Sequence, residues 1–263
     1  KDQGFKLLVQ QGGVFQSQGF PIPELPGAVY HQCLIGDLQH QGSMRSGQQE
    51  DAILLSDQGT QVFQISPNGM LTDSSLFARL APLKATRGRL TDFDITGKLD
   101  LIALNSTNQA LLFNRNQGTF SFNLDTTLTN LPSDLSGVVD FVFDDWDGDD
   151  LPDLFVTLES QPARLYLKQR GAQMKLSEIS ADWPQASTLA TGDLNNDLRS
   201  DVALLTEDAV QVRIQGGESP MALPLIGGKA KSIAFLDYDN DGWLDIVAYG
   251  EKVLRVWRNV GLE

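Results

Sequence analysis

The stretch Asp237-Tyr238-Asp239-Asn240-Asp241-Gly242-Trp243-Leu244-Asp245 precedes the apolar run Ile246-Val247-Ala248-Tyr249. Its carboxylates stand at positions 1, 3, 5 and 9 of nine, so they converge only if the chain curls around a common point. Glycine at position 6 permits a tight turn, and a hard divalent cation that prefers oxygen ligands is the natural guest. The β-branched run after the closing acid is typical of a strand. The stretch therefore predicts a calcium loop that opens onto a strand.

The same pattern recurs along the chain at a regular period. Three copies, 92–100, 145–153 and 193–201, keep the spacing of 8 residues between the first and the closing acid. A fifth, degraded copy, 37–51, is stretched by six residues. The closing Asp residues of the five copies are 49, 53, 48 and 44 residues apart: Asp51, Asp100, Asp153, Asp201 and Asp245. Such a period, with four short strands per unit, indicates a repeat architecture.

The amino-acid composition excludes several classes of function and of partner. The chain of 263 residues is 41% hydrophobic and carries a formal charge of −14, which argues against a nucleic-acid partner and against an anionic membrane surface. No run approaches the ~18 apolar residues of a membrane span, so we expect no membrane insertion. The single cysteine, Cys33, rules out an internal disulfide and is expected to be buried. The start at Lys1 suggests a piece excised from a longer protein, which forms a single domain over 1–263.

Between the loops, a strand, a glycine turn and a second strand also repeat. Each unit is thus strand A, acidic loop, strand B, short link, strand C, turn and strand D, and no amphipathic helix is evident. The expected C strands, most with a D strand after the turn, lie at 5–10, 62–65, 111–114, 164–167, 210–214 and 253–257. The predicted fold class is all-β, a β-propeller of four-stranded antiparallel blades. Five A–B pairs favour five blades, with the N-terminal strand as a clasp beside 253–257, and six C-like strands leave six blades as the alternative.

Two halves of the repeat together resemble a known family. The first half is the acidic loop with the start of strand B, as at 237–247. The second half is the pattern Leu-Tyr-x-Asn-x-Gly-x-x-x-Phe, which 164–167 and 113–120 match closely in other units. From about residue 5 to 261 the chain resembles the FG-GAP/VCBS repeats of bacterial surface proteins. It is similar to the integrin α-subunit propeller in architecture only, because the Phe-Gly pair of the family name is not evident. The resemblance implies a β-propeller with Ca²⁺ in its acidic loops, about three to four structural ions.

The local chemistry of four loops agrees with calcium. Positions 1, 3, 5 and 9 offer side-chain oxygens, and position 7 can offer its backbone carbonyl. The candidate ligands of the last loop are Asp237, Asp239, Asp241, Asp245 and the carbonyl of Trp243. Those of the 145–153 loop are Asp145, Asp147, Asp149, Asp153 and the carbonyl of Leu151, with Asp150 in the place of the glycine. The other two sets are Asp193, Asn195, Asp197, Asp201 with the Arg199 carbonyl, and Asp92, Asp94, Thr96, Asp100 with the Lys98 carbonyl.

The alternative for every loop is an Asp-rich turn capped by its own backbone amides. The stretched loop has Gln39 and Gln41 where acids are needed, so we expect no metal between Asp37 and Asp51. Elsewhere the metal is expected to be structural, since a closed loop that supplies about five or six oxygens leaves little room for substrate. An ion would relieve the mutual repulsion of the carboxylates and brace the turn between strands A and B.

The sequence contains no Ser/His/Asp arrangement, no phosphate loop and no Cys/His zinc spacing, and His31 and His40 are expected at the surface. We therefore expect a non-catalytic binding or scaffolding module of an extracytoplasmic protein, whether extracellular, at the cell surface or periplasmic. A lectin or a carbohydrate-active enzyme, lyase or glycosidase, on the same fold is the alternative.

A partner of this module, protein or carbohydrate, is expected on the face opposite the calcium loops. The A–B and C–D turns share one face of a blade, and the longer B–C and D–A links share the other. Long variable loops on a rigid ring are where recognition is usually placed. Candidate contact residues there, each of which could equally fill a gap between blades, are Phe77, Arg79, Arg87, Trp183 and the segment 20–23.

Overall fold

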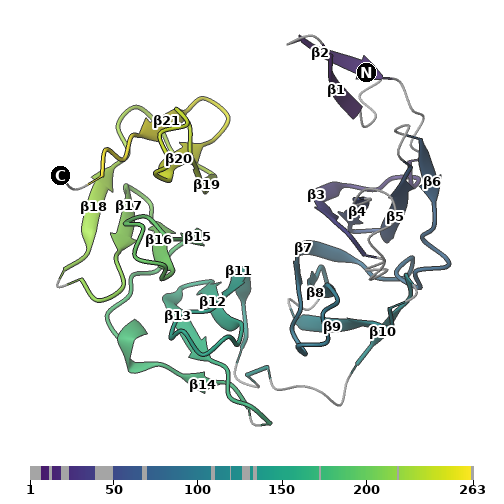
Figure 1. The fold of residues 1–263 in the computed structure, drawn as a ribbon, viewed down its shortest axis with the longest axis horizontal. Helices are drawn as coiled ribbons and strands as arrows, with labels where there is room; N and C mark the ends of the chain where they lie inside the picture. The colour runs from purple at the N-terminus through teal and green to yellow at the C-terminus, as the bar shows by residue number, and fades with distance from the viewer. Residues whose placement is uncertain are drawn as a thin grey trace. The chain divides into compact units, whose positions relative to one another are not determined.

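The computed structural model describes residues 7–11, 14–18, 24–38, 50–66, 70–107, 110–118, 120–125, 131–132, 135–171, 173–217 and 219–261. Within these ranges every regular element is a β-strand except one 3₁₀ turn, η1 (Glu178–Ser180). The strands form antiparallel sheets, and the chain divides into two compact units (Figure 1). Among the described residues no helix has the length and apolar character needed to cross a membrane.

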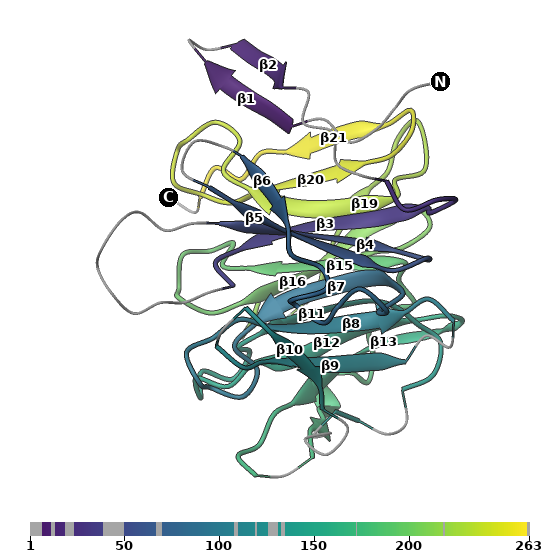
Figure 2. The ribbon, with the colours of Figure 1, turned by 90° about the vertical axis from the view of Figure 1, so that its right-hand side faces the viewer.

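Unit 1 comprises Lys1–Asn108 and Leu112–Asp125. It contains a hairpin, β1 (Leu7–Gln11) with β2 (Val14–Gln18), and two four-stranded sheets that lie side by side (Figure 2). The strands of the first sheet are, in order, β3 (Tyr30–Gly36), β4 (Asp51–Ser56), β5 (Thr60–Ile65) and β6 (Leu71–Asp73). Those of the second are β7 (Ala85–Thr91), β8 (Asp100–Asn105), β9 (Leu111–Asn116) and β10 (Phe122–Leu124).

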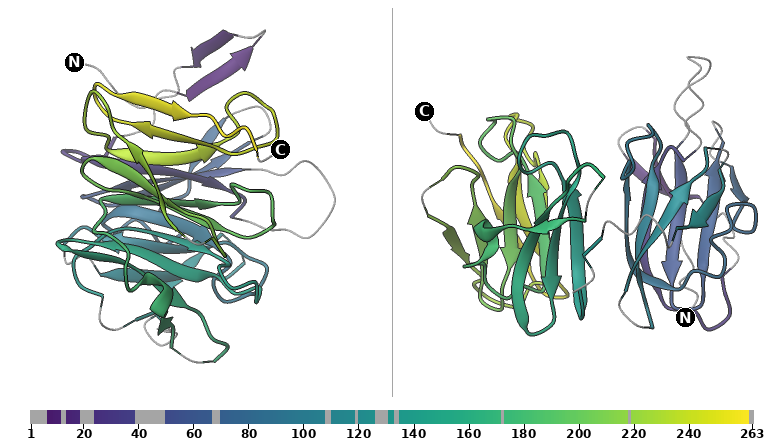
Figure 3. Two further views of the ribbon diagram at one scale, coloured as in Figure 1. Left: turned by 90° about the vertical axis from the view of Figure 1, so that its left-hand side faces the viewer. Right: turned by 90° about the horizontal axis from the view of Figure 1, so that it is seen from below.

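Unit 2 comprises Gln109–Leu111 and Thr126–Glu263 and contains three sheets side by side (Figure 3). The third sheet has β11 (Val138–Asp144), β12 (Asp153–Leu158), β13 (Gln161–Leu167) and β14 (Lys175–Leu176). The fourth has β15 (Thr188–Gly192), β16 (Asp201–Leu205), β17 (Ala209–Arg213) and β18 (Met221–Pro224). The fifth has the described strands β19 (Ser232–Leu236), β20 (Asp245–Tyr249) and β21 (Leu254–Trp257).

The second strand of each sheet lies at the centre of the packing. Every residue of β4, β12 and β16 is buried, which explains why these strands read as continuous apolar runs rather than as alternating patterns. In unit 1 the side chains of β4 and β8 pack between the first and second sheets, around Ile53 and Leu101. In unit 2 one cluster joins the third and fourth sheets around Phe155 and Leu204, and another joins the fourth and fifth.

The predicted fold class is confirmed. All five predicted A–B pairs form, and the five sheets are the blades of a β-propeller with one three-stranded sheet among the described strands. Each closing Asp is the first residue of its B strand and lies opposite the residue that ends strand A, as Asp100 lies opposite Thr91. The N-terminal residues form the predicted hairpin. Its role as a clasp and the single-domain organisation stay predictions.

The predicted burial of Cys33 is wrong. Cys33 is exposed in β3, whose side chains alternate between partly buried and exposed positions. Because Leu34 packs toward the core of unit 1, its neighbours Cys33 and Ile35 must point to the opposite face of the strand. The apolar residues Leu34 and Ile35 next to Cys33 did not indicate its burial, because successive side chains of a strand point to opposite faces and only one face of β3 is packed.

Candidate metal-binding loops

The four acidic loops share one backbone conformation, although their sequences differ. Positions 4 and 6 have positive φ in each of them, a left-handed conformation that glycine adopts most easily. Position 4 is held by Ile95, Gly148, Asn196 and Asn240, and position 6 by Gly97, Asp150, Leu198 and Gly242. The expectation that Asp150 replaces a glycine in this conformation is confirmed, with φ 62°. Because non-glycine residues also adopt positive φ at these two positions, glycine alone does not determine the conformation of the loop.

The first Asp of each loop curls the backbone around its own carboxylate. In the last loop, the two oxygens of Asp237 accept hydrogen bonds from the N–H groups of Asp241 and Gly242, each at 3.0 Å. Asp92 accepts in the same way from Thr96 and Gly97, at 2.8 and 2.7 Å. These bonds join residues four and five positions apart, so the loop conformation does not depend on contacts with distant parts of the chain.

The closing Asp is buried and ties the loop to the end of strand C in the same sheet, 14 to 16 residues further along the chain. One oxygen of Asp245 accepts from the N–H of Tyr238 at position 2, and the other accepts from Asn259 in the turn after strand C, at 2.8 and 2.7 Å. The same two bonds are made by Asp100, Asp153 and Asp201. Even in the stretched loop Asp51 accepts from Leu38. Position 9 is therefore a structural brace in addition to a candidate ligand.

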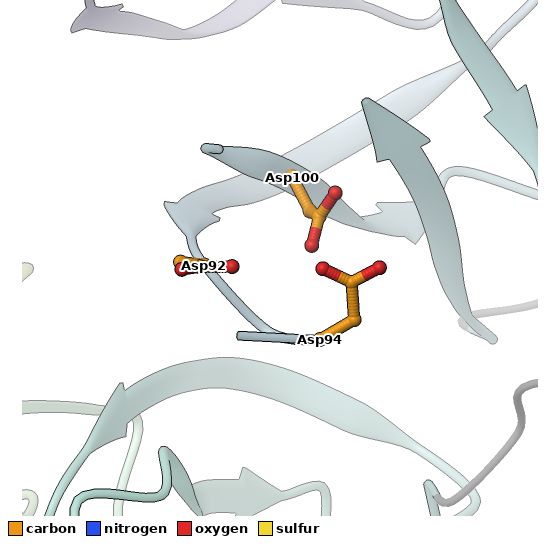
Figure 4. A group of neighbouring side chains, drawn as sticks. All are labelled: Asp92, Asp94 and Asp100. Atoms are coloured by element: carbon orange, nitrogen blue, oxygen red, sulfur yellow. The ribbon is translucent and has the colours of Figure 1, made fainter. Parts of the chain in front are cut away.

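Three of the four loops bring three carboxylates together. Oxygens of positions 1, 3 and 9 lie within 4.8 Å of one another in Asp92/Asp94/Asp100, in Asp145/Asp147/Asp153 and in Asp237/Asp239/Asp245. Figure 4 shows the first group, with its carboxylates turned toward one point at the start of β8. Calcium binds oxygens at about 2.3–2.6 Å, so oxygens on opposite sides of one ion lie about 5 Å apart. The all-oxygen donor set and its spacing fit a calcium ion.

The loop 193–201 does not assemble such a triad of acids. Its position 3 is Asn195, whose amide donates to Asp197 at 3.1 Å. The position-5 carboxylates cap the loop from within, since Asp149, Asp197 and Asp241 each accept from the N–H two residues on. In the loop 92–100, the residue at position 5 is Thr96, whose hydroxyl donates to Asp94 at 2.7 Å. The position-7 carbonyls of Lys98, Leu151, Arg199 and Trp243 stay predicted ligands.

Arginines at the end of strand C contact two of the triads: Arg115 lies in β9, and Arg258 directly follows β21. The Nε of Arg115 lies 2.6 Å from Asp94, and Arg258 pairs with both Asp239 and Asp241. These guanidinium groups partly neutralise the acids and would compete with a metal cation for the same oxygens. Among the described residues no cationic side chain forms an ion pair with the triad of the 145–153 loop. That triad is therefore the one with the strongest demand for an external cation.

Burial and like charges raise the pKa of several loop carboxyls. Desolvation raises the pKa of Asp100 and of Asp153 to about 6, against the opposing effect of their backbone hydrogen bonds. Desolvation also raises the pKa of Asp201. The pKa of Asp147 is raised by desolvation and by the neighbouring charges of Asp149 and Asp145. A divalent cation would relieve this repulsion and hold the groups ionised.

One set of residues at these loops had no role in the prediction. The side-chain amide of Asn116 donates to the carbonyl of Leu38, in the loop of the preceding sheet, at 2.9 Å. Gln215 reaches the carbonyl of Trp146 in the same manner, and Asn259 reaches that of Leu194 at 2.6 Å. The Asn-x-Gly pattern at 116–118 and 259–261 was the available signal, because the same Asn accepts from the glycine N–H.

The residues predicted to contact a partner on the face opposite the acidic loops lie in different environments. Phe77 is 64% exposed, whereas Trp183 is buried in the core between the third and fourth sheets. Arg79 has φ 61° and bonds to Asn123, and Arg87 lies in β7 rather than in a link. Trp183 is therefore a core residue and cannot serve as an exposed anchor. The segment 20–23, His40, Gln39 and Gln41 lie outside the described residues, while His31 is exposed as expected.

A cavity of about 620 Å³ opens beside Phe77 on the face opposite the loops of the first sheet. Its walls come from the link before β3, the turn between β4 and β5, and the link after β6. The lining residues include Gln58, Gln61, Asp73, Ser75, Leu76 and Phe77. It combines polar groups with an exposed apolar rim, which is the composition of many ligand sites.

A comparison with family models finds the FG-GAP-like repeat at residues 92–156 and 193–248. The first match begins at the loop of the second sheet and runs through that of the third, and the second covers the fourth and fifth loops with their B strands. A comparison with curated proteins finds no similar sequence. The repeats that the sequence predicted are thus confirmed in these two regions.

Solved structures share the fold. AofleA from Arthrobotrys oligospora has a TM-score of 0.56 and 18% identity, covering 95% of this chain and 74% of that one. An Agrocybe aegerita lectin that recognises non-reducing terminal N-acetylglucosamine has a TM-score of 0.51 and 17% identity, with 89% and 77% covered. At such identities the likeness shows the fold and nothing finer.

Proposed function

Because FG-GAP-like repeats match two regions of this β-propeller, we propose that the chain is a non-catalytic, calcium-stabilised binding module of an extracytoplasmic protein. The observation that carries the proposal is the repetition of one carboxylate triad in three loops at equivalent positions. A catalytic metal would be needed once, whereas a brace is useful in every repeat. Millimolar extracellular calcium suits loops that lie outside the cytoplasm.

The partner of the module, protein or carbohydrate, docks on the face opposite the acidic loops. The cavity beside Phe77 supports this surface, since its mouth carries the exposed apolar side chains Leu76 and Phe77. Exposed apolar groups rimmed by polar residues mark interaction sites more often than bare surface does. The acidic loops are, by contrast, committed to metal and to their own backbone.

Hydrogen bonds between side chains and backbone brace the walls of this cavity. Asp73 accepts from the N–H and the hydroxyl of Ser75, at 2.9 and 2.6 Å, and so shapes the link after β6. The hydroxyl of Tyr30 donates to Gln61 at 2.5 Å. Arg79 holds a left-handed backbone conformation in the same link, a strained geometry that the surrounding bonds must maintain. A preformed site loses little entropy when a partner binds.

The enzyme alternative has less support. Among the described residues, the carboxyls with a clearly raised pKa are Asp100, Asp147, Asp153 and Asp201, all of them in the acidic loops. A glycosidase needs a general acid with raised pKa facing a substrate cleft. None of these four carboxyls is among the described residues that line the cavity beside Phe77.

Binding of the full chain to immobilised glycans and candidate proteins in calcium-containing buffer tests the surface. Phe77→Ala should weaken the interaction, because it removes an exposed aromatic anchor of the type found at binding hot spots. Tyr238→Ala is the matched control, since Tyr238 is 66% exposed but lies in an acidic loop. Equal loss from both variants, or a complex seated on the acidic loops, would contradict the proposed surface. Turnover of a polysaccharide would favour the enzyme instead.

A further inference from the structure

A second cavity, of about 290 Å³, lies between the third and fourth sheets of unit 2. Its walls come from the loop that contains Trp146, from the link between β14 and β15, and from the turn between β17 and β18. Ile179, Trp183, Arg213, Gln215 and Pro220 are among its lining residues. Neither the calcium loops nor the surface beside Phe77 accounts for this cavity. It is at the lower end of the range of ligand sites, about 300–1,000 Å³.

Three buried polar atoms in the walls of this cavity have no hydrogen-bond partner within the described part of the chain. They are the indole Nε1 of Trp183, the guanidinium Nε of Arg213 and the side-chain Oε1 of Gln215. Trp183 is 3% exposed, so its N–H is cut off from bulk water. Native proteins rarely leave such groups unpaired, and here two donors and one acceptor occur around a single cavity. The grouping points to a ligand.

The contacts of each residue explain why this polar atom has no hydrogen-bond partner among the described residues. The NH2 group of Gln215 donates to the carbonyl of Trp146, and the reverse orientation would set two oxygens against each other, so Oε1 is the free atom. One terminal nitrogen of Arg213 donates to the carbonyl of Asp182 at 3.1 Å, which leaves Nε unused. Phe155 stacks on Trp183 at 6.1 Å and Arg213 covers it at 6.0 Å, so the indole is available by its edge only.

We propose that this cavity binds one neutral monosaccharide unit through its hydroxyl groups. A sugar hydroxyl both accepts and donates, so neighbouring hydroxyls can accept from Trp183 and Arg213 and donate to Gln215. Ile179, Ile214 and Pro220 supply apolar wall for the C–H groups of the ring. A neutral sugar is favoured over an anionic one, because Asp182 already faces Arg213 at 3.4 Å and the acidic loop 145–153 provides Trp146.

The test follows the indole N–H of Trp183 directly. The full chain, labelled with ¹⁵N at its tryptophans, is titrated with the methyl glycosides of N-acetylglucosamine, galactose, mannose and glucuronic acid in calcium-containing buffer. The chain has 4 tryptophans, and Trp183→Phe identifies the signal of Trp183. We expect at least one neutral glycoside to shift this signal at millimolar concentration. Trp183→Phe should weaken its binding about tenfold, the effect of one lost hydrogen bond.

Arg213→Lys provides a second variant, because it keeps the charge and removes the Nε–H donor. It should also weaken binding, while Arg255→Lys, in β21, should not. If no glycoside moves the Trp183 signal, the sugar site is excluded and water satisfies the three atoms. If only the glucuronide moves it, the neutral class is wrong. Phe77→Ala should leave this titration unchanged, so failure here is distinct from failure of the surface in unit 1.

Discussion

The side-chain amide of Asn259 donates a hydrogen bond to the backbone carbonyl of Leu194, 2.6 Å away, and joins the fifth sheet to the acidic loop of the fourth. The same amide donates to Leu244 in its own loop at 3.2 Å, and its backbone N–H donates to Asp245. One residue therefore connects two successive loops. The bond recurs at Asn116 and Gln215, so within each unit these bonds link successive acidic loops to one another.

Asn116→Ala should destabilise the chain through this connection. Asn116 is buried, and its amide donates to the carbonyls of Leu38 and Leu99 at 2.9 and 3.1 Å. Leaving buried carbonyls unpaired costs about 1–3 kcal/mol, which urea denaturation resolves. Asn123→Ala is the control, since its exposed amide group only accepts from Arg79 and its loss should cost less than about 0.5 kcal/mol. Equal costs would show that the inter-sheet bonds carry no stability.

Asp147→Ala should remove one calcium ion from the chain. Asp147 belongs to the triad that has no arginine partner among the described residues, so its loss leaves two of the three carboxylates of that triad. Calorimetric titration of chelator-stripped protein should show one site fewer than in the unaltered chain. Stabilisation at about 100-fold excess over Kd, about 2.7 kcal/mol per site, should fall accordingly. Asp37→Ala should leave the stoichiometry unchanged, and equal losses from both variants would refute the assignment of the stretched loop.

Leu198→Gly should stabilise the chain, contrary to the usual effect of glycine. Leu198 is 94% exposed and has φ 65°, so it loses no packing and is relieved of left-handed strain. The strain is about 1–2 kcal/mol, and we expect a gain of about 1 kcal/mol in the free energy of unfolding. Gly242→Leu tests the reverse, because a Cβ at Gly242 would meet nothing within 4 Å. A neutral or stabilising result for Gly242→Leu would contradict the interpretation.

The stability of the calcium-free chain should fall as pH rises from about 4 to above 6. Asp100 and Asp153 have a folded-state pKa of about 6 against an ordinary value of 3.8, so the folded state binds more protons than the unfolded state in this interval. The contribution of these two groups is therefore fully present below about pH 4 and is lost as pH rises through their folded-state pKa of about 6, in the absence of metal. Calcium binds the ionised carboxyls, so its stabilising effect should grow over the same interval.

Melting temperatures between pH 4 and 8, in chelator and in calcium, check this expectation. The difference between the two curves isolates the loops from the other titrating groups of the chain. It should be small at low pH and largest at neutral pH. A difference that is constant with pH would contradict the link between the buried carboxyls and the metal.

The sequence by itself determined the repeat and the shape of its loops, because both depend on local interactions. Asp237 accepts from N–H groups four and five residues further along, and the run after Asp245 is apolar because strand B is covered on both faces. These features are written in consecutive residues. The fold class and the position of the acidic loops could therefore be predicted from the order of residues alone. The sequence also assigned an equivalent ligand set to 193–201, where the described residues form no triad of acids.

Only the tertiary structure decided which residues these loops depend on and which surfaces are open. The bond from Asn259 to Leu194 spans 65 residues, and no local pattern specifies such a distance. The burial of Trp183 and the exposure of Cys33 follow from which strand face meets a neighbouring sheet. The side-chain atoms of Trp183, Arg213 and Gln215 that have no partner among the described residues meet at one cavity because two segments distant in sequence pack there. Burial and pairing are properties of packing between distant segments, so the sequence could propose these residues but not their roles.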